Sequence, residues 1–231
     1  MTINEDNQTL LAGRFYISNR KISLTYKILA VIVGIYGQIL ALDILDGQLK
    51  VHEYLYYTRI SNLLVLLFFI ASAFYVQKKI RESGNNGPAT LWPLAKGAVI
   101  IAITVTMAIY WTMLYDPADV TDVLEDYLVH LVMPLMMLFD WLFFDAKGTF
   151  KFWHPFVWLV IPYVYFGFTL VAGPMGLVYP NGKHYPYPFI NVDERGIEDV
   201  LTTVLWITLG FLLFSFVLVA VDKLLRGRKR N

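Results

Sequence analysis

The chain has 231 residues, is 57% hydrophobic and has a mean hydropathy of +0.54, values that exceed those of soluble domains and indicate a polytopic membrane protein. Its formal net charge of +1 gives no basic field for binding nucleic acid. The absence of cysteine excludes disulfides, iron–sulfur clusters and a cysteine nucleophile.

Six apolar runs divide the chain, each of about 18–22 residues, which is the length that a bilayer requires. The residues before them are polar and contain no signal-peptide core, so we expect a cytoplasmic N-terminal segment over residues 1–26 and an uncleaved first span. The fold class is predicted to be an all-α, six-helix transmembrane bundle forming one membrane domain (27–222), with a basic tail (223–231). We expect the spans at residues 27–45, 57–75, 94–115, 125–144, 156–172 and 200–221.

Lysine and arginine divide unequally between the two sets of connections. Of the 19 basic residues, 15 fall on the side that holds both termini. The other side holds four, namely Lys50, Arg59, Lys183 and Arg195. Because cytoplasmic loops carry the excess of basic residues, both termini are predicted to be cytoplasmic.

The second predicted span opens with the polar sequence YYTRISN before its apolar run begins. Thr58, Ser61 and Asn62 recur at i, i+3 and i+4 and so share one face of a helix. A threonine at a helix start is ordinarily an N-cap or a partner in an interhelical hydrogen bond. That structural interpretation stays open beside a functional one.

The fourth predicted span, EDYLVHLVMPLMMLFDWLFFD, carries His130 inside an apolar run, and an ionisable group at membrane depth marks a candidate functional site. Asp126 lies four residues earlier on the same face, where it can hold one ring nitrogen and fix the tautomer. Pro134 has no backbone N–H to donate to the carbonyl of His130, so the helix is predicted to kink there. Asp140 lies about 15 Å further along the helix, so we expect it to have a structural role near the inner face.

With cytoplasmic termini, the second and fourth spans run in the same direction, so Thr58 and His130 both fall in the outer part of the membrane. A lone histidine there can also simply bond a neighbouring helix. Metal binding by His130 with His52 or His184 is disfavoured because no pair has a ligand spacing such as HExxH, so no metal is expected.

The last outer connection, residues 173–199, is rich in proline, glycine and tyrosine. Tyr185, Tyr187 and Phe189 alternate with two prolines, which fix backbone angles and predict an ordered segment. The segment is either a lid over a site between the helices or an aromatic plug at the interface.

Three stretches stand together in this order: YYTRISNLLVLL, YLVHLVMPLMMLFDWLFF, and GLVYP with YPYPF. On these stretches and the span count, the chain resembles the bacterial six-span relatives of the androgen-induced-protein family. Animal members of that family are membrane threonine hydrolases acting on fatty acid esters of hydroxy fatty acids. Their catalytic pair is a threonine early in the second span and a histidine in the fourth span before a proline. The resemblance implies Thr58 and His130 in these roles and a bacterial-type plasma (inner) membrane location.

The leading hypothesis is therefore an intramembrane lipid-ester hydrolase that needs no metal or organic cofactor. Thr58 would be the nucleophile, His130 the general base, and Asp126 or a backbone carbonyl the group that orients the ring. Asn62 or Ser61 would donate to the developing oxyanion. The partners would be membrane lipids, with a lipid-ester substrate from the outer leaflet. The alternatives are a non-catalytic lipid-binding or sensory membrane protein, and a small transporter, although no internal repeat supports the latter.

Overall fold

The computed structural model describes residues 16–117 and 123–227, and within these residues it is helical and contains no strand. Among them, six helical segments are long and apolar enough to cross a membrane: Arg20–Ala41, Tyr57–Ser83, Pro93–Leu114, Val123–Phe144, His154–Ala172 and Ile197–Leu224. The predicted all-α, six-helix class is confirmed, and the chain is an integral membrane protein.

The described residues hold nine α-helices and two π-helical turns, and all of these except α9 belong to the six segments. The α-helices are α2 (Arg20–Ala41), α3 (Tyr57–Ser83), α4 (Pro93–Ile109), α5 (Val123–Tyr127), α6 (Met133–Phe144), α7 (His154–Trp158), α8 (Val160–Ala172), α9 (Val192–Arg195) and α10 (Ile197–Leu224). The π turn η3 (Tyr110–Leu114) continues α4, and the π turn η4 (Leu128–Val132) joins α5 to α6. The connections hold short 3-10 helices, namely η1 (Ile44–Asp46), η2 (Val51–Leu55) and η5 (Pro188–Ile190).

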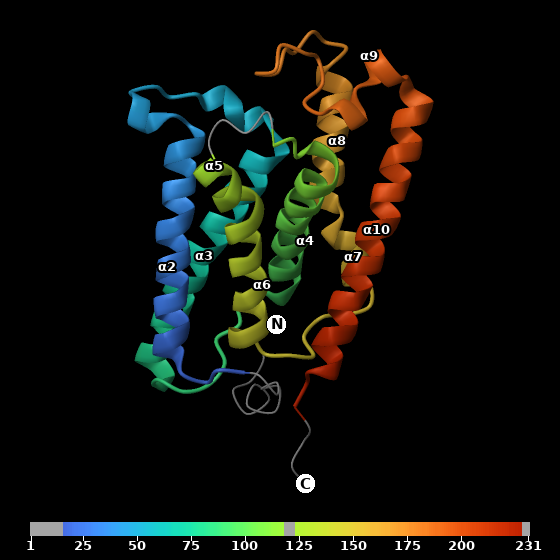
Figure 1. Cartoon of the computed structure of the whole chain (residues 1–231). Coiled ribbons are helices and arrows are strands. Elements are labelled where there is room, and N and C mark those ends of the chain that lie inside the picture. Colours follow the sequence, from blue (N-terminus) through green and yellow to red (C-terminus); the bar gives the residue numbers. More distant parts are fainter. Residues whose placement is uncertain (1–15, 118–122, 228–231) are drawn as a thin grey trace.

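The helices stand side by side, with α2 and α3 on one side, α8 and α10 on the other, and α4 and α6 between them (Figure 1). The start of α2 and the end of α10 lie at the same end of the bundle. We call this end, with connections 84–92 and 145–153, the basic end. The opposite end, with connections 42–56 and 173–196, is the lid end.

The first helix begins seven residues earlier than the predicted start at residue 27 and ends at Ala41 rather than at residue 45. Asn19 caps it by accepting hydrogen bonds from the amides of Lys21 and Ile22. The Arg20 guanidinium is buried because it donates to four backbone carbonyls, those of Lys79, Gly84, Gly87 and Pro88. Arg20 and Lys21, which were expected in the cytoplasmic segment 1–26, therefore belong to the first turn of α2. Residues 1–15 of that segment lie outside the described part.

Other boundaries move by smaller amounts. α3 continues to Ser83, beyond the predicted end at residue 75, and α10 runs from Ile197 to Leu224. The predicted basic tail thus begins with two helical residues, and residues 228–231 are not described.

α4 is the central helix, because Val99–Thr106 is buried on every face, as expected for a helix that is apolar all round. At its start, Trp158 of α7 donates its indole N–H to the carbonyl of Leu94 at 3.0 Å. Gly97 allows this contact, since a Cβ atom at that position would overlap the Trp158 ring. The centre of the bundle is therefore closely packed towards the basic end.

Candidate functional site

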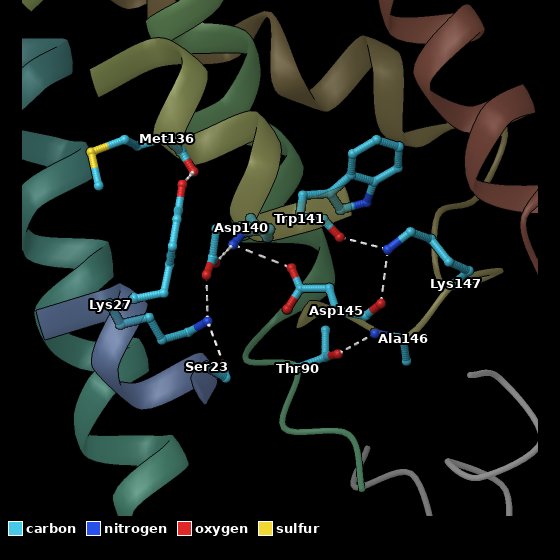
Figure 2. A network of polar contacts seen from close by, with 11 residues as sticks. Ser23, Lys27, Thr90, Met136, Asp140, Trp141, Asp145, Ala146 and Lys147 are labelled. Carbon is cyan, nitrogen blue, oxygen red and sulfur yellow. Dashed lines mark hydrogen bonds and ion pairs between the residues drawn. The ribbon is translucent and has the colours of Figure 1, made fainter. Parts of the chain in front are cut away.

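Two groups of polar side chains lie inside the bundle, one at each end. At the basic end, Asp140 of α6 is fully buried and receives two lysines (Figure 2). Lys27 Nζ lies 2.5 Å from one carboxylate oxygen, and Lys96 Nζ contacts the other. Lys27 also donates to the hydroxyl of Ser23 at 3.1 Å. One carboxylate thus joins α2, α4 and α6.

The network continues into the connection after α6. The Asp145 carboxylate lies 3.2 Å from Lys96 Nζ. Lys147 Nζ donates to the carbonyls of Trp141 and Asp145 at 2.5 and 2.8 Å. Burial lowers the pKa of Lys147 to about 8. The sequence predicted a structural role for Asp140 near the inner face. It placed Lys27 and Lys96 among the basic residues of the connections and did not predict that they reach Asp140 inside the bundle.

At the lid end, the polar side chains of α3 donate hydrogen bonds to a backbone carbonyl in the first turn of the same helix. The carbonyl of Thr58 accepts from Ser61 Oγ at 3.0 Å and from Asn62 Nδ2 at 2.9 Å. Ser61 Oγ also lies 2.6 Å from Thr106 Oγ1 of α4. Since the Ser61 proton goes to the Thr58 carbonyl, Thr106 is the donor in that pair.

His130 lies in the π turn η4, buried against the π turn η3. Its ring stacks on Tyr110 with centroids 3.6 Å apart and planes 6° apart. Nδ1 lies 3.1 Å from the backbone carbonyl of Asp126 and 3.5 Å from its carboxylate, the partner that the i, i+4 spacing indicates. Because both groups accept hydrogen bonds, Nδ1 carries the proton and Nε2 keeps its lone pair.

The backbone at His130 is opened by Pro134, which has no N–H to give to the carbonyl of His130. The indole of Trp111 donates to that carbonyl instead, at 3.1 Å. Aromatic residues of η3 therefore contact His130 through both its ring and its backbone. Single π turns of this kind occur frequently at functional sites.

Asn62 connects Thr58 to the turn that carries His130. Its Nδ2 donates to the carbonyl of Thr58 at 2.9 Å and to the carbonyl of Val129 at 3.1 Å. Within the described residues, no hydrogen bond joins the side chains of Thr58 and His130. Thr58 of α3 and the turn that carries His130 are thus linked through the Asn62 side chain.

The two predicted oxyanion donors are both occupied here. Asn62 uses its amide N–H groups on carbonyls, and its buried Oδ1, an acceptor, has no partner among the described residues. Ser61 gives its only proton to the carbonyl of Thr58. The hydroxyl of Tyr57, which the sequence did not single out, is buried without a described partner, and Tyr57 lines the cavity beside Thr58.

This cavity has a volume of about 100 Å³ and lies between α3, α4, α8 and α10. Its walls are mostly apolar, and its hydroxyl groups belong to Tyr57, Thr58, Thr106, Tyr163, Tyr165, Tyr187 and Thr208. Thr58 therefore faces an apolar space of the kind that accepts small or chain-like ligands. His130 is not among the lining residues.

The segment predicted to be either a lid or an aromatic plug forms part of the cavity wall at the lid end. Tyr187 and Phe189 line it, with their rings stacked 5.5 Å apart. The Tyr187 hydroxyl lies 3.4 Å from the amide nitrogen of Thr58, and burial raises the pKa of Tyr187. Tyr185 is buried against Gly173, where an added Cβ would lie 2.8 Å from its ring.

The remaining histidines singled out by the sequence stand apart from this site. His52 is exposed, and His184 Nδ1 bonds the carbonyl of Leu177 at 3.0 Å. Over residues 16–117 and 123–227, no three histidine, aspartate or glutamate side chains gather as metal ligands.

No family model, curated protein or solved structure matches this chain. Its chemistry must therefore be inferred from its own side chains.

Proposed function

We propose that the protein is an intramembrane hydrolase of lipid esters, with Thr58 as the nucleophile and His130 as the general base. The observation that supports this most is the Asn62 bridge, which joins a threonine on an apolar cavity to the turn of an oriented histidine. Nucleophile, base and a third group that orients the base form the recurring pattern of acyl-transfer sites.

In the proposed reaction, Nε2 of His130 takes the proton from Thr58 Oγ1 as that oxygen attacks the ester carbonyl carbon. His130 then gives this proton to the leaving alcohol, and an acyl-threonine remains. A water molecule, deprotonated by His130, releases the acid and restores Thr58. The reaction requires the two side chains to close to about 2.6–3.2 Å when substrate is bound.

Asp126 keeps the Nδ1 proton in place and stabilises the imidazolium that forms. The buried Tyr57 hydroxyl is the donor available to the developing oxyanion, because Asn62 and Ser61 already donate to backbone carbonyls. The apolar walls of the cavity match the acyl chain of a membrane lipid ester, and the cavity would have to widen beyond its volume of about 100 Å³ to admit one.

We further propose that the basic end faces the cytoplasm of a bacterial-type plasma membrane and that the lid end faces outward. The excess of lysine and arginine at the basic end supports this orientation. Compartment-sensitive reporters fused after Asn231 and inserted at Asn181 should report opposite sides. An extracytoplasmic C-terminus would contradict both the orientation and substrate delivery from the outer leaflet.

The activity is tested by hydrolysis of fatty acid esters of hydroxy fatty acids by the purified protein in vesicles. Thr58→Ala and His130→Ala should each abolish hydrolysis, and the double variant should be little worse than either. Thr202→Ala and His52→Ala change exposed residues of the same types and serve as matched controls. Full activity in a folded Thr58→Ala protein would exclude Thr58 as the nucleophile, and Ser61 would be the next hydroxyl to test.

A second candidate function is non-catalytic lipid binding. It is favoured by one observation, that the His130 ring stacks on Tyr110 and does not line the cavity. In that case the wild-type protein should retain a lipid in the cavity but hydrolyse no ester, and Thr58→Ala should leave retention unchanged.

A further inference from the structure

The walls of the cavity differ in how well they are closed. On the α4 side, Val105 and Thr106 are buried. At the lid end, Tyr187 reaches the amide of Thr58 and stacks on Phe189. On the α8–α10 side, Leu159 and Tyr165 are buried, but most lining side chains are only half-buried, namely Pro162, Phe166, Val204, Ile207 and Phe211. This side separates the cavity from the lipid-facing surface of the bundle.

One polar contact crosses the α8–α10 side. The hydroxyl of Tyr163 lies 2.8 Å from Oγ1 of Thr208. Thr208 donates its own proton to the carbonyl of Val204 at 2.7 Å, so Tyr163 is the donor between the helices. The Tyr163 residue is 46% exposed, so the bond lies at the surface of the wall and not in the core.

The Tyr163–Thr208 contact lies deep in the membrane, where a hydroxyl has few alternative hydrogen-bond partners. Tyr163 lies nine residues before the lid-end terminus of α8, and Thr208 lies eleven residues after the start of α10. At 1.5 Å per residue, these positions are about 14 and 16 Å below the helix ends, near the middle of the hydrocarbon layer. Lipid tails offer a hydroxyl no partner, so the Tyr163 hydroxyl has an acceptor in Thr208 only while the two helices stay together.

The two helices are also joined nearer the basic end. Phe156 of α7, which leads into α8, packs edge-on against Phe216 of α10 with ring centroids 5.7 Å apart. Separation of α8 from α10 beside the cavity can therefore leave their basic ends in contact.

We propose that the gap between α8 and α10 is a lateral port through which the acyl chain of a membrane lipid enters the cavity, and that the Tyr163–Thr208 hydrogen bond is its latch. The port rests on the proposed function in taking the cavity as the substrate site. Its operation is separate from hydrolysis, because a chain can fill the cavity without being cleaved.

The absence of cysteine allows a direct test in the whole protein. Tyr163→Cys/Thr208→Cys is locked by a short bis-methanethiosulfonate linker, which spans the distance that the tyrosine ring bridged and is released by reduction. Phe156→Cys/Phe216→Cys, treated in the same way, ties the same helices nearer the basic end. Each protein, in phosphatidylcholine vesicles containing a diazirine-bearing palmitic acid, is irradiated, and the insertion sites are mapped by mass spectrometry.

We expect carbene insertion at Val105 and Ile109, the α4 residues of the opposite cavity wall, in the unlocked protein. In the cross-linked Tyr163→Cys/Thr208→Cys variant, insertion should fall to background and return after reduction. The control cross-link should leave insertion unchanged, and Tyr163→Phe, which removes the latch, should accelerate it severalfold.

Unchanged insertion in the locked variant, or no insertion on α4 in the unlocked protein, would overturn the port. Because the readout needs no ester cleavage, a failed hydrolase with lock-sensitive insertion leaves the port standing. An active hydrolase with lock-insensitive insertion contradicts the port alone.

Discussion

The two ends of the bundle bury polar groups in opposite ways. At the basic end, full charges pair with one another, as Asp140 does with Lys27 and Lys96. At the lid end, neutral hydroxyl groups line a cavity, and Tyr57 Oη, on that lining, has no described partner. At the basic end, Asp145 Oδ2 and Asp222 Oδ1 also lack a described hydrogen-bond partner, but neither residue lines this cavity. Groups left with unused hydrogen-bonding capacity next to an open space suit a ligand, whereas paired charges suit assembly of the helices.

The comparison teaches that membrane depth alone does not identify a functional group. By burial and charge, Asp140 is the more conspicuous residue, yet its charge is already neutralised by two lysines. His130 is less conspicuous, but its Nδ1 is held by Asp126 and its Nε2 has no assigned partner among the described contacts. We therefore expect substitutions at the basic end to change stability and substitutions at the lid end to change activity.

The largest expected effect is that of Asp140→Asn. Removing this charge leaves Lys27 and Lys96 buried without their shared carboxylate, which should cost about 3–5 kcal/mol of unfolding free energy. The unfolding midpoint in mixed micelles checks this, with the exposed Asp193→Asn as control. Lost hydrolysis at unchanged stability would instead place chemistry at the basic end.

Replacing the whole ion cluster at once tests whether the loss in Asp140→Asn comes from unpaired charge. Lys27→Met, Lys96→Met and Asp140→Leu together remove every member of the central pairings, and Lys147 remains beside Asp145 to offset its charge. Stability should recover most of what Asp140→Asn loses, since apolar replacement of a buried ion cluster is often neutral or better. Hydrolysis should recover with it.

A pH effect is expected from Lys147. Its pKa falls from 10.5 to about 8 on burial, so between these pH values the unfolded state binds more protons than the folded state. Stability should therefore rise with pH across this window by up to about 3 kcal/mol, and this term should be constant below it. Unfolding midpoints of the wild type and Lys147→Gln, compared from pH 7 to pH 10.5, should diverge, and parallel curves would refute the effect.

Gly97→Ala tests how tightly the basic half is packed. The new Cβ would overlap the Trp158 ring, and overpacking of this kind costs about 1–3 kcal/mol. Gly210→Ala is the matched control, because nothing lies within 4 Å of its Cβ position. Equal unfolding midpoints for the two variants would show that the α4–α7 contact yields easily.

The smallest expected effect on stability is that of Tyr187→Phe. It removes one hydroxyl contact to the amide of Thr58, and a polar contact between membrane helices is worth about 0.6 kcal/mol on average. The unfolding midpoint should hardly move, while hydrolysis should fall severalfold as the lid loosens. If Tyr187→Phe instead abolished hydrolysis as completely as Thr58→Ala, Tyr187 would belong to the reacting set.

The six spans could be predicted from length and hydropathy, which are properties of single segments. The start of the first helix could not be predicted in this way, because a hydropathy scale scores Arg20 and Lys27 only as residues that disfavour a membrane span. Four carbonyls and Asp140 satisfy these side chains, and those partners lie far away in the sequence. Pairing between helices is invisible to a scale that scores one residue at a time.

The same limit applies to the candidate site. Spacing along one helix indicated that Asp126 can reach His130 and that Ser61 and Asn62 share a face with Thr58. The Tyr110 stack and the Asn62 bridge to Val129 depend on how η3, η4 and α3 are rotated against each other. Nothing in the sequence pattern sets that rotation.

In the proposed mechanism, Thr58 is a nucleophile that His130 activates. The most direct measurement is reaction of the protein in vesicles with an alkyl fluorophosphonate, followed by mass spectrometric mapping of the adduct. Thr58 Oγ1 should displace fluoride and carry the phosphonyl group, and His130→Ala should abolish the adduct while His52→Ala does not. An unmodified Thr58 in the folded wild-type protein, or an adduct that persists without His130, would contradict the claim.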